Sequence, residues 1–233
     1  MQYKFAEELR PALLVGRDGR HDLLKIDGEE RTAWHPAVGP RVRSSAGVPC
    51  LVAVNMSAGE AWYTVAAVQI SCGDGGKAWV CVQPVLLERA AIYFLESGWM
   101  DGITGEYGHA ARSPEVGKCR LDFDKGSVYV EVCSPAAVSG RAACRAGAGL
   151  LSSADYLLSC GRMRGAGKRM VCLAVFQHGA CRQAQAVPGR KTREGLKKAA
   201  ERGVEFWVAE TRMGMDGISL LSYHNVTDSI QGW

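Results

Sequence analysis

The chain has 233 residues, of which 47% are hydrophobic, and it carries a formal net charge of +4. This length suits one large domain or two small ones, and the apolar content is sufficient for real hydrophobic cores. The charge is too small to indicate nucleic-acid binding by itself, although it permits such binding. No apolar run approaches the roughly 18–20 residues of a membrane-spanning helix, so we expect no membrane contact.

Nine cysteines are spread through the chain without any C-x-x-C pair. Their number is odd, and Cys81 and Cys172 lie inside apolar, strand-like segments. These features favour free buried thiols over a disulfide framework, and the spacing argues against a structural zinc site. The first residues resemble neither a signal peptide nor a transit peptide. We therefore expect an intracellular reducing compartment, either the cytoplasm or an organelle matrix.

The first third of the chain predicts a small OB-like β-barrel domain, which we assign to residues 1–84. Residues 1–10 favour a short amphipathic helix, and six short strands separated by Gly- and Asp-rich turns follow. The expected strands are residues 12–15, 22–26, 31–34, 49–55, 61–71 and 77–82.

OB-like barrels often bind nucleic acid through exposed aromatic and basic side chains. The sequence leaves two interpretations open here, because a tryptophan in a barrel strand is often part of the core and scattered arginines often belong to a solvated face. The candidates for nucleic-acid contacts are Arg17, Arg20 and Trp34, with Trp62, Tyr63, Trp79, Arg41 and Arg43 as further members of the set.

Residues 85–233 predict a second domain, with a mixed sheet flanked by helices. Helices are expected at residues 85–97, 150–158 and 192–202, the last beginning at Thr192 as its cap. Strands are expected at residues 170–176, 204–209 and 218–222. The last helix has a basic outer side that suits phosphate, although a lysine-rich helix is often merely well solvated. Its candidate contacts are Lys191, Arg193, Lys197 and Lys198.

Residues 120–133 predict a β-hairpin that carries two carboxylates. A turn at residues 125–126 would place Arg120 opposite Glu131. Asp122 would then be a diagonal neighbour of Glu131, about 7–8 Å away at the backbone. The two acids could hold one Mg²⁺ ion, which prefers oxygen ligands. Alternatively, Glu131 forms only a cross-strand ion pair with Arg120.

The hairpin is similar to the acid, hairpin, acid-x-Lys pattern of PD-(D/E)xK nucleases. In those enzymes the acids hold the metal, and the lysine positions the attacking water. The lysine position is Cys133 in this chain, and a thiol that is mostly neutral at pH 7 supplies no fixed cation.

From about residue 80 to residue 223, the chain resembles the sugar fermentation stimulation protein A (SfsA) family. The resemblance implies an N-terminal OB-like domain, a C-terminal nuclease-like domain and nucleic-acid binding, with nuclease activity in some members. It rests on residues 80–84, 119–123, 129–132, 172–178 and 199–205, and more weakly on residues 27–36.

Several polar positions of the family pattern are changed in this chain. The lysine position is Cys133, and Gln83-Pro84 stands where the family has Asn-Thr. The family's His-Cys-Pro-Asn-Thr-Gly loop reads His35-Pro36-Ala37-Val38-Gly39, so His35 is kept as a candidate nucleic-acid contact without its usual neighbours. Retained scaffold residues with altered site residues are the pattern expected of a retired active site.

We therefore expect an α/β (α+β) protein with an OB-like barrel followed by a PD-(D/E)xK nuclease-like mixed sheet flanked by helices. The favoured function is binding of DNA or RNA without catalysis or cofactor, as a binding or structural subunit of a ribonucleoprotein or other larger assembly. Two alternatives stay open. One is an Mg²⁺-dependent nuclease in which Asp122 and Glu131 hold the metal, and the other is a protein-interaction module without nucleic-acid contact.

Overall fold

A computed structural model of the chain describes residues 1–19, 21–34, 47–57, 60–71, 76–105, 111–112, 120–123, 126–133, 146–164, 169–177 and 189–232. Strands make up most of the regular structure in these residues. Within the same ranges, no helix is both long and apolar enough to cross a bilayer.

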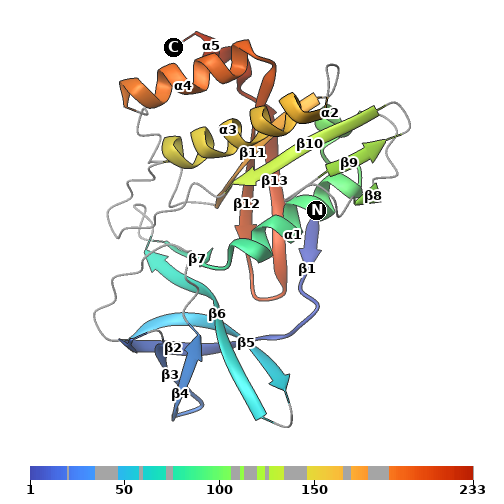
Figure 1. Ribbon diagram of the computed structural model, residues 1–233. Coiled ribbons are helices and arrows are strands. Elements are labelled where there is room, and N and C mark those ends of the chain that lie inside the picture. Colours follow the sequence, from blue (N-terminus) through green and yellow to red (C-terminus); the bar gives the residue numbers. More distant parts are fainter. Residues whose placement is uncertain are drawn as a thin grey trace.

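Five strands close into a small barrel, which lies at the lower end of the molecule in Figure 1. They are β2 (Leu9–Asp18), β3 (His21–Ile26), β4 (Glu29–Trp34), β5 (Val48–Ser57) and β6 (Glu60–Ser71). β2 pairs antiparallel with β3 and β5, β3 with β4, and β5 with β6. A short parallel pairing of β4 with β6 closes the ring. The expected OB-like barrel is therefore confirmed.

A mixed sheet continues from the barrel, and its central strands are parallel. Its order is β7-β12-β11-β10-β9-β8, with β13 and then β1 paired beside β12. The strands are β1 (Gln2–Lys4), β7 (Lys77–Cys81), β8 (Ala111–Arg112), β9 (Arg120–Phe123), β10 (Gly126–Cys133), β11 (Arg169–Gln177), β12 (Val204–Met213) and β13 (Gly217–Asn225). β10, β11 and β12 run parallel. The barrel and the mixed sheet are joined in one path of strands, and the domain division at residue 84 stays a prediction.

Helices cover both faces of the mixed sheet. Alternate residues of the parallel strands, such as Val130 and Leu173, form one core with the helix that follows β7. The residues between them, such as Tyr129 and Cys172, form a second core under the later helices. The helices are α1 (Pro84–Glu96), α2 (Asp101–Thr104), α3 (Ala146–Arg164), α4 (Arg190–Glu201) and α5 (Thr227–Gln231).

Two local expectations are wrong. Residues 1–10 contain β1 and the start of β2 rather than a helix, because β1 gains backbone partners along β13. A Cβ at Gly217 would collide with the Tyr3 carbonyl oxygen, so glycine permits this close approach. Helix α4 begins at Arg190, and its N-cap is Gly189 instead of Thr192.

The Gln177 side chain links the barrel side of the sheet to the parallel strands. Gln177, the last residue of β11, is 3% exposed. Its Oε1 accepts a hydrogen bond from the Cys81 backbone N–H at 2.6 Å, and its Nε2 donates one to the Cys81 carbonyl at 3.1 Å. β7 and β12 themselves pair only at Trp79 and Met213 in the described register. The amide of Gln177 thus takes the place of a missing strand neighbour.

We expect Gln177→Ala to lower the free energy of unfolding by about 2–5 kcal/mol, because it removes the partners of two buried backbone groups. Urea unfolding followed by circular dichroism measures this change. Gln231→Ala, at an exposed position of α5, is the matched control and should change stability by less than about 0.5 kcal/mol. Equal effects of the two substitutions would contradict a special role for Gln177.

Candidate functional site

Two tryptophans lie on the outer face of the barrel, where β4 meets β6. Trp34 is directly opposite Thr64, and Trp62 precedes Thr64 by two residues. Because alternate residues of a strand share a face, both indoles are on the same side of the sheet. Trp34 is 54% exposed and Trp62 is 44% exposed, which is far more than in a core. The alternative interpretation from the sequence, that barrel tryptophans belong to the hydrophobic core, is therefore excluded for Trp34 and Trp62.

The surroundings of Trp34 support its orientation. His21 lies opposite Trp34 in the β3–β4 register, and the two rings meet edge to face with centroids 5.5 Å apart. Arg17 is exposed on the neighbouring strand β2. Oligonucleotides bind OB barrels across the second and third barrel strands and the adjoining loops. The second and third strands here are β3 and β4, so His21 and Trp34 occupy that face.

The other expected barrel residues are placed differently or lie outside the described ranges. Tyr63 is half-buried and packs against the barrel core, and Trp79 is half-buried against the core beside α1. They are therefore poor stacking platforms. The candidates outside the described residues are Arg20, His35, Arg41 and Arg43.

Helix α4 carries a second basic surface at the opposite end of the molecule from the barrel (Figure 1). Leu196, Ala199 and Ala200 are buried and fix which side of the helix faces the sheet. Arg190 pairs with Glu194 across one helical turn, at 2.9 Å. The sequence-predicted contacts on this helix are exposed at Lys191, Lys197 and Lys198 and half-buried at Arg193.

The predicted hairpin is present, but its register differs from the expected one by two residues. Phe123 pairs with Gly126 and Asp122 pairs with Ser127. Glu131 therefore lies four residues beyond the partner of Asp122, about 13 Å further along β10. The two acids are not diagonal neighbours. A shift of two residues leaves every side chain on its original face, so the hydrophobic pattern cannot distinguish the two registers.

Glu131 lies in a buried environment under α3. It is 3% exposed and pairs in register with Cys172 of β11. The Sγ atoms of Cys133 and Cys172 are 4.0 Å apart, and Cys172 also lies 4.0 Å from the Leu150 carbonyl of α3. The hydrogen bond with Cys133 and burial raise the pKa of Cys172 well above its usual value. Both thiols are free, as expected from the sequence.

The described residues do not fit a divalent cation shared by Asp122 and Glu131. The register separates the backbones of these acids, and Glu131 lies beside thiols in a covered core. No group of three or more His, Cys, Asp or Glu side chains in the described ranges is arranged to hold a metal ion.

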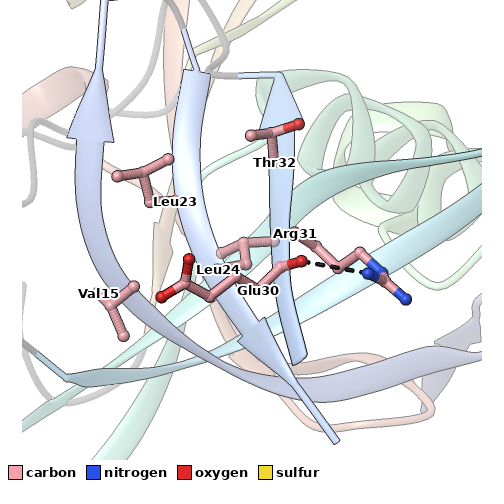
Figure 2. Close-up of a pocket in the computed structure, with 6 residues that line it drawn as sticks. All are labelled: Val15, Leu23, Leu24, Glu30, Arg31 and Thr32. Carbon is pink, nitrogen blue, oxygen red and sulfur yellow. Dashed lines mark hydrogen bonds between the residues drawn. The ribbon is translucent and has the colours of Figure 1, made fainter. Parts of the chain in front are cut away.

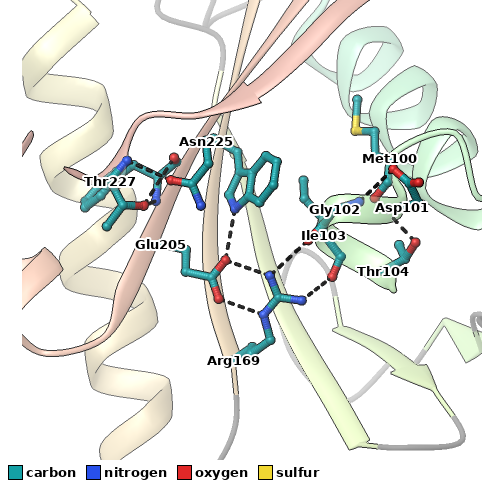
Figure 3. Close-up of polar contacts among 11 residues, drawn as sticks. Met100, Asp101, Gly102, Ile103, Thr104, Arg169, Glu205, Asn225 and Thr227 are labelled. Atoms are coloured by element: carbon teal, nitrogen blue, oxygen red, sulfur yellow. Dashed lines mark hydrogen bonds and ion pairs between the residues drawn. The ribbon is translucent and has the colours of Figure 1, made fainter. Parts of the chain in front are cut away.

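Sequence reasoning missed a polar cluster between the mixed sheet and α2 (Figure 3). Arg169 of β11 donates two hydrogen bonds of 2.6 Å to the Glu205 carboxylate of β12. The same guanidinium reaches the carbonyls of Gly102 and Ile103, and the Trp207 indole N–H donates to Glu205 at 3.0 Å. An acid within an otherwise apolar strand was the available sequence signal for Glu205. The cluster ties three elements together and is structural in character.

Comparison with known proteins identifies the fold. Neither a protein-family model nor a curated protein sequence matches the chain. Among solved structures, SfsA from Pyrococcus furiosus in complex with Ca²⁺ matches with a TM-score of 0.65 and 20% sequence identity. The match covers 95% of this chain and 97% of that chain. The chain therefore has the SfsA-like fold over nearly its whole length, as the sequence resemblance implied.

The Arg169–Glu205 pair predicts a pH dependence of stability. Burial by itself would raise the pKa of Glu205, but hydrogen bonds from Arg169 and Trp207 outweigh it and lower the pKa. A carboxylate with a lowered folded-state pKa stabilises the fold above its unfolded pKa of about 4.3, and this stabilisation is lost as the pH falls through the folded-state pKa.

We therefore expect Glu205→Gln to reduce the free energy of unfolding at neutral pH by about 1 kcal/mol, a value reduced for partial exposure. The difference from the unmodified protein should shrink as the pH falls from about 5 to about 3. Denaturant titrations across this range measure it, with Glu96→Gln at the exposed end of α1 as the control. A difference that is independent of pH would contradict the assignment.

Proposed function

We propose that this protein binds single-stranded nucleic acid on the outer face of its barrel and does so without catalysis. The observation that carries the proposal is the pair of exposed indoles, Trp34 and Trp62, on adjacent strands of one face. Every nucleobase has an aromatic face, so such a pair binds bases with little dependence on sequence. Exposed aromatic side chains mark a surface that contacts another molecule, and Leu13 and Met56 are further exposed apolar residues of the barrel.

The charge distribution supports a phosphate-binding partner. Residues 190–202 contain six cations and two acids, and Lys191 and Lys198 are exposed on α4. Arg17 is exposed on β2, and Lys25 is exposed on the same face as Trp34. Cations in these positions would attract a polyanion over a distance and release its counterions on contact. We assign the barrel face to base stacking, and α4, at the opposite end of the molecule, to phosphate contacts with a distant part of a long strand.

The absence of catalysis in the proposal rests on the altered hairpin. The position of the nuclease lysine is Cys133, and the register separates Asp122 from Glu131. A fold that keeps its binding face and loses its catalytic residues suits a binding or structural subunit of a ribonucleoprotein or other larger assembly. Purification of the native protein from its host, followed by identification of the bound nucleic acid and proteins, tests this part of the proposal.

Substitution of the two indoles tests the binding face. We expect Trp34→Ala and Trp62→Ala each to weaken binding of a fluorescent oligothymidylate by about tenfold, which corresponds to the loss of one stacked base. The salt dependence of binding should not change, because no phosphate contact is removed. Fluorescence anisotropy titrations at several salt concentrations measure both quantities. Tyr156→Ala, which also removes an exposed aromatic side chain but from α3, is the control.

Substitutions on α4 should change the salt dependence of binding, because they remove phosphate contacts. The Lys191→Gln, Lys198→Gln double variant should reduce the slope of log K against log salt by about 1.4, since each phosphate contact on a single strand contributes about 0.7. If neither DNA nor RNA binds to the unmodified protein, the proposal is wrong. Salt-insensitive association with a protein would then favour the interaction module.

A metal-dependent nuclease is the second candidate, because the similar SfsA structure from Pyrococcus furiosus contains Ca²⁺. Ca²⁺ and Mg²⁺ both take oxygen ligands, and Asp122 and Glu131 are the acids that would supply them. We expect no cleavage of DNA or RNA when Mg²⁺ is added. Cleavage that requires Mg²⁺ and disappears in both Asp122→Ala and Glu131→Gln would replace the binding proposal with this one.

A further inference from the structure

A hollow of about 330 Å³ lies on the barrel, across β2, β3 and β4. Val15 and Leu23 form part of its wall (Figure 2). A β-bulge between Leu14 and Gly16 places an extra residue, Val15, against Leu23 of the neighbouring strand. The remaining lining residues are Leu24, Glu30, Arg31 and Thr32. The volume is at the lower end of the range for small-ligand sites.

The hollow is lined by three apolar residues and by one acidic side chain, Glu30, beside Arg31 and Thr32. Figure 2 shows the Glu30 carboxylate extending across β3 toward Val15, whereas the Arg31 guanidinium points away. Arg31 instead pairs with Glu29 and the Glu30 carbonyl. Among the described residues, the Glu30 carboxylate forms no hydrogen bond or ion pair. A carboxylate can only accept hydrogen bonds, so the hollow suits a flat apolar group that carries N–H donors.

The hollow lies on the same face as the proposed stacking site. Thr32 precedes Trp34 by two residues on β4, a separation of about 6.6 Å along the strand. This spacing is close to that between neighbouring bases of an extended single strand. Lys25 lies directly opposite Glu30 in the β3–β4 register and can reach a phosphate beside the hollow. A base stacked on Trp34 would therefore have its neighbour at the hollow.

We propose that this hollow is a base-selective subsite that prefers guanine in single-stranded nucleic acid. The Watson–Crick edge of guanine presents its N1–H and N2–H donors side by side, so one carboxylate can accept both. Adenine and cytosine offer an amino group beside a ring acceptor, and thymine and uracil offer one N–H between two carbonyls. In a duplex the guanine edge is already paired, so the preference requires a single strand. The inference rests on the proposed function and adds selectivity to it.

The experiment compares three otherwise identical oligothymidylates that carry thymine, guanine or inosine at one central position. Inosine keeps N1–H but lacks the N2 amino group. We expect the unmodified protein to bind the guanine strand about tenfold more tightly than the all-thymine strand, with inosine between them. Glu30→Gln should bind all three strands with nearly the affinity of the unmodified protein for the all-thymine strand. The glutamine amide keeps one acceptor oxygen and replaces the other with an N–H donor group, so it cannot accept from both N1–H and N2–H of guanine.

Glu29→Gln is the matched control, because Glu29 is the neighbouring acid and is already paired with Arg31. It should keep the guanine preference. Equal affinity of the unmodified protein for all three strands, or an undiminished preference in Glu30→Gln, would overturn the guanine subsite while leaving nucleic-acid binding intact. Failure of the unmodified protein to bind any strand would overturn both proposals. Circular dichroism spectra of the variants show whether the exposed substitutions preserve the fold.

Discussion

The two hydrogen bonds between the Gln177 side chain and the Cys81 backbone hold the barrel side of the sheet against the parallel strands. β7 is the last strand before α1, so its position determines where that helix begins to cover the sheet. On its free side, β7 meets β12 only at its Trp79 pairing. Because buried backbone groups need partners, the neutral Gln177 amide, whose oxygen accepts and whose NH2 donates, satisfies both Cys81 groups at this junction without burying a charge.

The hairpin of β9 and β10 is packed between the two cores of the mixed sheet. Its apolar face still contributes Val128 and Val130 to the core with α1. Its other face is also covered, and Glu131 lies there beside two thiols instead of in an open site. A lysine two residues after Glu131 would place a cation where the half-buried Cys133 now packs. The exposed functional candidates lie instead on the barrel and on α4.

The barrel face combines aromatic, basic and acidic side chains, none of which indicates nucleic-acid binding by itself. Trp34 and Trp62 provide aromatic surface, and Lys25 provides positive charge. Glu30 is an acceptor within an apolar hollow on the same strands. Stacking and phosphate contact do not distinguish one base from another, whereas a carboxylate at a Watson–Crick edge does. Affinity and selectivity are thus assigned to different side chains of one surface.

The sequence by itself determined the strands and helices that have strong patterns. The barrel, the central strand at β11 and the basic helix α4 follow from local periodicity, since those patterns need no distant partner. The sequence prediction was wrong for residues 1–10, where pairing with β13 overrides the local helical preference. It was also wrong for the cap of α4, which is Gly189 and not Thr192.

Only the tertiary structure decided the properties that depend on contacts far apart in the sequence. The hairpin register was ambiguous because a shift of two residues preserves both faces. Exposure of the indoles depended on the short pairing of β4 with β6, and the role of Glu205 depended on Arg169, 36 residues away in the chain. The sequence therefore determined which elements form, and the packing of distant elements decided which side chains reach solvent and which are covered.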